Sequence, residues 1–470
     1  MFSADTYAAR RAQLKEALPE GLVLFLGHDE SPRNYADNPY PFRQDSSFLY
    51  YWGLDTPGLA GLIDVDAGTE VLFGHDPTVD EVVWTGPTPS LAERGRRIGV
   101  TDCRAFHELA AGLERAQAQG RTVHLLPQYQ PASQQQMATL LDLPSDRVND
   151  YASEALIRAI VAQRAVKSDE EIAEIEASAD VAHAMHTAIM EHTAPGVREQ
   201  TVAGKMTGIA REQGARFSFQ PTVSVHGEVL HNTITARPMQ AGEMLLCDAG
   251  AETRSHYASD ITRVTPVSGT FTDAQRALYR VVLEAQERAI AACEVGVPYR
   301  DVHRQAARDM ASGLKDLGFM RGDVDEAVAE GAHALFFPHG LGHLMGLDVH
   351  DMEGLGENHV GYDDEFQRSD QFGLNYLRLA RRLEPGFVLT VEPGLYFIPT
   401  LIDQWQAEGR HAAFIDYDKV EQFKDFGGIR IEDDVLVTED GPRILGPPIP
   451  KAIDDVEALA GTAHSAQQVP

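Results

Sequence analysis

Two stretches of nine residues share one pattern: GEMLLCDAG at residues 242–250 and GFVLTVEPG at residues 386–394. In each, a glycine leads into a short apolar run that ends in a carboxylate, Asp248 or Glu392, and a second glycine follows two positions later. Apolar runs of this length between glycines predict buried β-strands. Two copies of one such unit would present a pair of carboxylates symmetrically across a cleft.

The sequence around these stretches predicts a mixed α/β chain of two domains. A chain of 470 residues is too long for one compact core. Short apolar runs alternate with turns and helical stretches between about residues 20 and 150. A capping box of Ser168 and Glu171 then opens a long helix. We expect an amino-terminal domain at 1–160, a second domain at 161–450, and a tail at 451–470 whose last residues are mobile.

Composition excludes several classes of partner. The chain carries 40 Lys and Arg against 71 Asp and Glu, a formal net charge of -31, which repels nucleic acid and anionic lipid headgroups. We therefore expect no nucleic-acid or membrane partner. The three cysteines, Cys103, Cys247 and Cys293, are widely spaced and odd in number. They predict neither a disulfide framework nor a thiolate metal site. This pattern fits a reducing environment, so we expect a cytoplasmic location.

Carboxylates and one imidazole recur at the edges of the apolar runs. Each alone carries little weight, because a lone carboxylate there is usually a turn or cap residue and a single histidine is equally consistent with a structural role. Glutamates among β-branched residues are unfavourable when buried without a partner, and a cation would resolve this for the whole set. Four carboxylates and one imidazole suit Mn²⁺, Co²⁺ or Zn²⁺, and favour two ions over one. The set is Asp248, Asp260, His343, Glu392 and Glu432.

The motif HGLGH at 339–343 places two histidines four positions apart. Gly340 and Gly342 make a helix costly, and the glutamate that follows the first histidine in helical zinc motifs is missing. A helical zinc motif is therefore rejected. The glycines instead predict a backbone pressed close to a ligand or metal.

These five residues, with HGLGH, GLDVHD (346–351), TVEPGLYF (390–397) and GGIRIEDD (427–434), resemble the prolidase and aminopeptidase P group of metallopeptidases, peptidase family M24. The resemblance covers about 168–445, and YPFRQDSSF at 40–48 is similar to the amino-terminal domain of these enzymes. It implies a pita-bread (creatinase-like) α/β catalytic domain, preceded by a smaller α/β amino-terminal domain.

The resemblance also implies roles for individual residues. Asp260 and Glu432 would bridge two divalent ions, first of all Mn²⁺, with Asp248 completing one ion and His343 with Glu392 the other. Glu392 would also move the proton of the attacking water. Further catalytic or substrate-binding positions are His231, His339, His350 and Tyr396. One departure is that eleven residues separate Asp248 from Asp260, one more than in many relatives, so the hairpin tip near His256 is less predictable.

The substrate class follows from the same resemblance. Hydrolysis of Xaa-Pro bonds is expected, and a dipeptidase needs an arginine to bind the free substrate carboxylate, for which Arg378 and Arg430 are candidates. We predict an Xaa-Pro dipeptidase acting as a homodimer or homotetramer. The alternatives are an Xaa-Pro aminopeptidase on longer peptides, an organophosphate or creatine-type hydrolase, and a non-catalytic binding module, which would be expected to have lost some of the five ligands.

Overall fold

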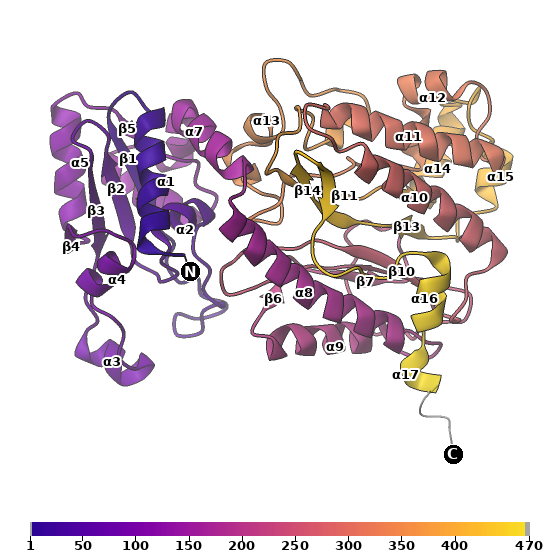
Figure 1. Cartoon of the computed structure of the whole chain (residues 1–470), viewed down its shortest axis with the longest axis horizontal. Helices are drawn as coiled ribbons and strands as arrows, with labels where there is room; N and C mark the ends of the chain where they lie inside the picture. Colours follow the sequence, from indigo (N-terminus) through magenta and orange to yellow (C-terminus); the bar gives the residue numbers. More distant parts are fainter. Residues whose placement is uncertain (1, 466–470) are drawn as a thin grey trace. The chain divides into compact units, whose positions relative to one another are not determined.

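The computed structural model describes residues 2–465, and these form two compact units (Figure 1). One unit runs to Arg164 and takes in the distant segment Met352–Val360, which holds the short turns η3 (Glu353–Leu355) and α13 (Glu357–Val360). The other comprises Ala165–Asp351 and the chain from Gly361 onward. No sequence signal marks Met352–Val360 as part of the first unit. The domain bounds expected from the sequence, 1–160 and 161–450, stay a prediction. Across residues 2–465, every helix is too short or too polar to cross a bilayer.

The amino-terminal unit is built on a five-stranded mixed sheet in the order β4-β3-β2-β1-β5. The central strand β1 (Leu22–Leu26) is buried throughout, which explains its uninterrupted apolar sequence LVLFL. It pairs antiparallel with β2 (Ala60–Asp64) and parallel with β5 (Val123–His124). The remaining elements are α1 (Ala4–Ala17), α2 (Ser46–Trp52), β3 (Thr69–Gly74), α3 (Val79–Thr85), α4 (Leu91–Arg97), β4 (Cys103–Ala105), α5 (Glu108–Ala118), α6 (Pro131–Leu141), η1 (Ser145–Tyr151) and α7 (Glu154–Ala165).

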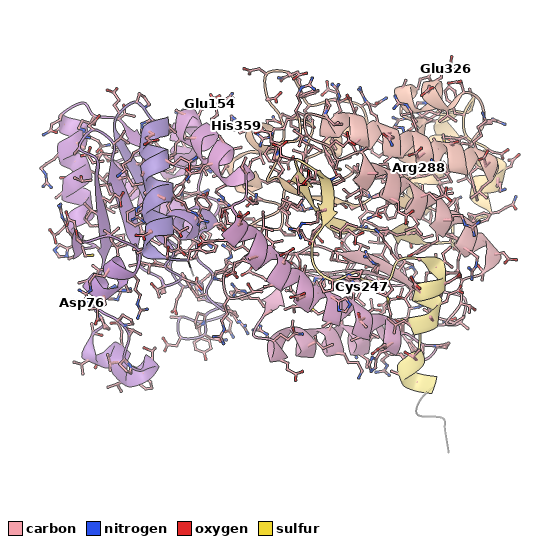
Figure 2. All side chains as sticks on the ribbon, in the orientation of Figure 1. Asp76, Glu154, Cys247, Arg288, Glu326 and His359 are labelled. Atoms are coloured by element: carbon pink, nitrogen blue, oxygen red, sulfur yellow. The ribbon has the colours of Figure 1, made fainter. Side chains whose placement is uncertain are left out.

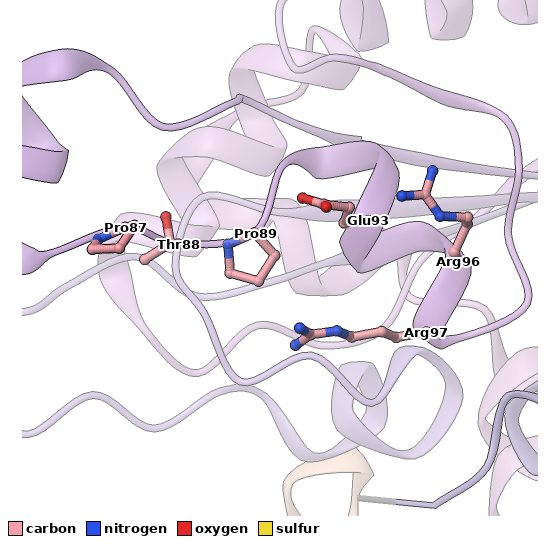
Figure 3. Close-up of a pocket in the computed structure, with 6 residues that line it drawn as sticks. All are labelled: Pro87, Thr88, Pro89, Glu93, Arg96 and Arg97. Carbon is pink, nitrogen blue, oxygen red and sulfur yellow. The ribbon is translucent and has the colours of Figure 1, made fainter.

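Helix α3 lies apart from the sheet of its own unit in Figure 1. None of its residues is buried, although it carries three valines and Trp84. The segment that joins it to α4 borders a pocket of about 540 Å³, drawn in Figure 3 and lined by Pro87, Thr88, Pro89, Glu93, Arg96 and Arg97. The exposed apolar helix is therefore accessible on the surface of this unit.

The second unit consists of two similar halves, each a helix pair followed by a three-stranded antiparallel sheet. In the first half, α8 (Asp169–His192) and α9 (Glu199–Glu212) precede the sheet of β7 (Thr222–Ser224), β8 (Met244–Asp248) and β10 (Thr262–Pro266). In the second half, α10 (Asp273–Ala291) and α11 (Tyr299–Asp316) precede the sheet of β11 (Val388–Val391), β14 (Asp433–Thr438) and β15 (Gly441–Ile444). The predicted capping box of Ser168 and Glu171 does open α8.

The first helix of this unit fixes the strand that carries Asp248. The imidazole Nε2 of His186 on α8 donates to the carbonyl of Ala249, 2.9 Å away, directly after β8. Cys247, labelled in Figure 2, is buried on β8 with its sulfur 4.0 Å from that of Met206 on α9. Apolar packing on one face and a helix hydrogen bond at the end together hold the strand terminus in place.

The hairpin between Asp248 and Asp260 turns at a residue in the left-handed conformation. It contains β9 (Ala251–Glu252), which pairs with β6 (Arg216–Phe217). His256 at its tip has φ 68° and is buried, and its Nδ1 lies 2.5 Å from Oε1 of Glu252. The tip that the sequence left open is thus pinned by a side chain of its own hairpin.

The other elements of the second unit are short. They are β12 (Gly394–Tyr396), β13 (Gly428–Arg430), α12 (Val324–Glu330), η2 (Ala332–Leu335), η4 (Leu374–Tyr376), α14 (Pro399–Glu408), α15 (Tyr417–Glu421), α16 (Ile453–Leu459) and α17 (Thr462–Ser465). The predicted tail is therefore helical in part, and Glu457 of α16 pairs with Arg276 of α10 at 2.6 Å. The last residues, predicted to be mobile, lie outside the described range.

Candidate metal centre

The first half of the second unit supplies two carboxylates from one antiparallel strand pair. Asp248 is the last residue of β8, and its register partner on β10 is Thr262. Asp260 lies two positions before the start of β10, and its backbone amide donates to Oδ2 of Asp434 at 3.1 Å. Both aspartates are buried. The strand pairing therefore brings together two carboxylates that are twelve positions apart.

The second half supplies two glutamates, and the halves meet at Thr262. Glu392 directly follows β11, and Glu432 directly precedes β14. The amide of Glu432 donates to the carbonyl of Thr262 at 3.2 Å, and the hydroxyl of Thr262 donates to Oε2 of Glu432 at 2.6 Å. The carboxylates of both halves are thus joined by a short β-bridge across the unit.

His343 enters from a segment that runs along β11. Its Nδ1 donates to the carbonyl of Leu344 at 3.1 Å, which leaves Nε2 with a free lone pair. That Nε2 lies 3.5 Å from Oδ2 of Asp260 and 3.8 Å from Oε1 of Glu392. A Cβ on Gly342 would lie 2.0 Å from the carbonyl oxygen of Thr390. The close approach at Gly342 exists, and the backbone that it meets is that of Thr390 on the neighbouring strand.

The cluster is electrostatically unfavourable without a cation. Burial, followed by the charge of neighbouring carboxylates, raises the pKa of Asp260 and of Glu432 well above their ordinary values, and burial raises the pKa of Glu392. Oδ1 of Asp260 is buried and has no hydrogen-bond partner among residues 2–465. Asp260, His343 and Glu432 each offer one ligand atom, and these atoms lie within 4.8 Å of one another. This donor set fits a divalent cation.

A second set of side chains lies against the cluster. Nδ1 of His339 donates to the carbonyl of Gly340 at 2.7 Å, so its Nε2 accepts from the hydroxyl of Tyr396 at 2.9 Å. That hydroxyl accepts in turn from Nη1 of Arg430 at 2.8 Å. Burial raises the pKa of Tyr396, and burial together with Arg430 lowers the pKa of His339 to about 3. Tyr396 is therefore a neutral donor and His339 a neutral acceptor.

Arg430 is fully engaged inside the protein. Besides Tyr396, it donates from Nη2 to Oδ2 of Asp248 at 2.5 Å and from Nε to the hydroxyl of Thr262 at 3.1 Å. The side chain is almost entirely buried. With each of its three nitrogens donating to an internal partner, Arg430 orients Asp248 and Tyr396.

Three further predicted residues lie on segments around the cluster. The imidazole ring of His350 packs on that of His343, with 4.2 Å between the ring centroids. His231 lies on an exposed turn after β7. Arg378 is half-buried and follows Leu377, whose Cα would lie 2.9 Å from a Cβ on Gly340. The backbone at Arg378 therefore lies next to the segment that contains His339.

Sequence reasoning missed two polar residues of the centre. Thr262 bridges the two halves, and Asp434 accepts from the amide of Asp260. Thr262 lies two positions after Asp260, so both point to one face of an extended strand, and this spacing could have identified it. Asp434 ends the acidic run Glu432-Asp433-Asp434, where spacing alone does not separate its role from that of its neighbours.

Comparison with known proteins finds relatives that cover nearly the whole chain. Residues 173–439 match Metallopeptidase family M24, and residues 7–124 match the Aminopeptidase P, N-terminal domain. The Xaa-Pro dipeptidase of Homo sapiens is 32% identical over 97% of this chain and 93% of its own length. The Xaa-Pro aminopeptidase of Escherichia coli is 33% identical over 97% of both chains.

Solved structures agree with these matches. A variant of Escherichia coli aminopeptidase P in complex with substrate has a TM-score of 0.80 and 31% identity, covering 99% of this chain and 100% of that one. Aminopeptidase PepP of Pseudomonas aeruginosa has a TM-score of 0.81 and 27% identity, with 99% of each chain covered. The resemblance drawn from the motifs and the expected two-domain fold are both confirmed. The chain is an enzyme of metallopeptidase family M24, built as an aminopeptidase P-type amino-terminal domain followed by the family's catalytic domain.

Proposed function

We propose that this chain is a Mn²⁺-dependent Xaa-Pro dipeptidase whose two ions are held by Asp248, Asp260, His343, Glu392 and Glu432. The observation that carries the proposal is the buried convergence of Asp260, His343 and Glu432, with one carboxylate oxygen lacking a partner within residues 2–465. Asp260 and Glu432 lie at the junction of the halves and would serve both ions. When bound, the ions acidify a water and polarise the scissile carbonyl.

The remaining chemistry is assigned to side chains that face this cluster. Glu392 is the most exposed of the cluster's carboxylates with a side chain 19% accessible, so it can exchange a proton with a bound substrate. It would accept the proton of the attacking water and return it to the prolyl nitrogen. His350 and His231 would donate to the developing oxyanion, and His339 with Tyr396 would line the substrate site.

The dipeptidase assignment depends on Arg378. Arg430 is committed to internal partners, so we assign the substrate carboxylate to Arg378, which follows the residue that packs against the segment of His339. Arg378→Ala should raise KM for Gly-Pro about tenfold or more and spare Gly-Pro-Gly. Arg382→Ala is the matched control, since that exposed arginine pairs with Glu365. Equal loss on both peptides would reject the clamp.

An Xaa-Pro aminopeptidase is the second candidate. The match of residues 7–124 to the Aminopeptidase P, N-terminal domain favours it, and relatives of both kinds have similar identity to this chain. Turnover of Gly-Pro, a longer Xaa-Pro-Xaa peptide and a phosphotriester with added Mn²⁺ distinguishes the candidates. A preference for Gly-Pro supports the dipeptidase, and a preference for the longer peptide supports the aminopeptidase. A preference for the phosphotriester would reject both.

A homodimer or homotetramer is also proposed, with α3 as a contact to a second copy of the chain. Its Val79, Val83 and Trp84 are all strongly exposed, Trp84 at 86%, and contiguous apolar side chains of this kind mark interaction surfaces. Light scattering after size exclusion should show Trp84→Ser shifting mass toward the monomer. The three free cysteines support a reducing, cytoplasmic location.

A further inference from the structure

A second pocket lies between α11, α12 and η4 of the catalytic unit, where Phe337 stands between His303 of the pocket and His339. Its volume is about 270 Å³, and its lining includes His303, Arg304, Val328, His333, Gln371 and Leu374, together with Arg308 and Asp325, which pair with each other. Figure 1 shows α11 and α12 beside one another at the edge of this unit, and Figure 2 marks Glu326 on α12. The mechanism proposed above uses none of these residues.

Two buried histidines in the pocket lack hydrogen bonds. His303 is 1% exposed, and neither of its ring nitrogens has a partner among residues 2–465. His333 is 5% exposed, and its Nδ1 is likewise unpartnered. Burial lowers the pKa of His303 well below its ordinary value and that of His333 to about 4, so both rings are neutral. Each neutral ring offers one N–H donor and one acceptor, and leaving such groups unsatisfied is costly.

An arginine without a carboxylate partner stands beside them. Arg304 is half-buried, and no ion pair or hydrogen bond involves it within residues 2–465. Its neighbours on α11 do have partners, because Arg308 pairs with Asp325 at 2.8 Å and Arg300 with Asp301 at 3.2 Å. In a protein with a formal net charge of -31, an unpaired arginine beside two neutral donors forms a local site for an anion.

We propose that this pocket binds a small organic carboxylate, with its carboxylate on Arg304, hydrogen bonds from His303 and His333, and its apolar body against Val328 and Leu374. Guanidinium groups bind carboxylates in bidentate fashion. The apolar lining and the volume favour an organic acid over a bare inorganic oxyanion. A metal ion is disfavoured, because no group of three metal-ligating side chains in residues 2–465 forms here, and Arg304 repels cations.

The test is calorimetric titration of the Mn²⁺-loaded enzyme with isovalerate, and with isovaleramide as the neutral ligand of matched shape. Isovalerate should bind saturably and isovaleramide should not. Arg304→Gln and His303→Leu should each weaken isovalerate binding about tenfold. Arg288→Gln should leave it unchanged, because Arg288, labelled in Figure 2, lies on α10 and pairs with Asp309 at 3.1 Å.

Several outcomes would overturn the proposal. One is that isovalerate does not bind saturably, and another is that isovaleramide binds as tightly as isovalerate. A third is that Arg304→Gln binds isovalerate as tightly as wild type, which would place the ligand at the metal centre or elsewhere. Binding of inorganic phosphate or Zn²⁺ in place of isovalerate would also reject the carboxylate. Arg304→Gln changes a half-buried surface residue, so it keeps the test decisive if His303→Leu fails to fold. Because no peptide is turned over, the result is independent of the proposed peptidase activity.

Discussion

Glu432 and Asp433 are adjacent in sequence and both buried, yet they lie in opposite environments. Asp433 accepts from Arg263 at 2.6 Å, Lys451 at 2.6 Å and Gln286 at 2.7 Å. Burial alone would raise the pKa of Asp433, but Arg263 and Lys451 outweigh it and lower that pKa. Glu432 instead faces other carboxylates, and its pKa is raised. The chain supplies cations to Asp433 and leaves Glu432 among other carboxylates, as the proposed metal site requires.

Two neighbouring residues at the start of β14 therefore have different roles, one structural and one proposed to be functional. A buried charge needs a counter-charge, and the protein supplies it with its own side chains where only stability is at stake. Where the carboxylates are left crowded, the energetic deficit drives binding of a divalent cation. Substitutions on the two sides should therefore fail in different ways.

The largest effect is expected at Asp260. Asp260→Asn removes a carboxylate able to serve both ions, and kcat/KM on Gly-Pro should fall about a thousandfold, since a catalytic metal contributes several kcal/mol. The chelator-treated variant should unfold at higher urea than the chelated wild type, because one repelling charge is gone. Asp440→Asn, an exposed change, is the control. Undiminished turnover would contradict the assignment.

Asp433→Asn should instead lower the stability of the fold and leave catalysis largely intact. It leaves Arg263 and Lys451 without their shared counter-charge, which should lower the free energy of unfolding by about 4 kcal/mol in urea titrations. Metal content and kcat per folded molecule should remain close to wild type. Loss of metal with unchanged stability would mean that the two carboxylates have been assigned the wrong way round.

Acid should lower the free energy of unfolding through the buried imidazole of His186. Burial lowers the pKa of His186 to about 4, while its ordinary value is 6.5, so the folded chain excludes a proton that the unfolded chain binds between these values. Its contribution is complete above pH 6.5 and is lost as pH falls toward 4, about 2 kcal/mol by pH 5. His186→Gln should flatten this loss in urea titrations at pH 7 and 5. An unchanged slope would rule out His186 as its source.

Arg430 combines features of both environments, because it is a cation of the protein itself that contacts a proposed metal ligand, Asp248. Arg430→Lys keeps the charge but cannot reach Asp248, Tyr396 and Thr262 together, so kcat should fall about tenfold with metal content retained. Steady-state kinetics on Gly-Pro with Mn²⁺ measures this. If KM rises instead while kcat is unchanged, Arg430 binds the substrate carboxylate.

Much of the fold was predictable because its signals are local. The capping box of Ser168, the apolar run of β1 and the repeated strand ending in Asp248 or Glu392 all follow from short-range patterns. The family was predictable because five residues stood in a recognisable order. The segment Met352–Val360 gave no such signal, since its place in the amino-terminal unit depends on contacts between distant parts of the chain.

The details of the centre were harder to predict from sequence. Glu432, Asp433 and Asp434 look alike in sequence, and only the position of Arg263 and Lys451 in space gives a counter-charge to Asp433 among the three. Arg430 could be named as a candidate for substrate, but its three internal partners come from three separate segments. His303 and His333 gave no signal at all, because a histidine in a helix has many structural uses.

Cations should bind at the crowded carboxylates around Asp260 and not at Asp433, which the protein's own side chains compensate. Metal analysis of the chain after equilibration with Mn²⁺ and removal of free ions tests this most directly, in wild type, Asp260→Asn and Asp433→Asn side by side. The account predicts two ions per chain in wild type and Asp433→Asn, with a clear loss in Asp260→Asn. A fully active wild-type enzyme without metal, or a loss in Asp433→Asn alone, would contradict it.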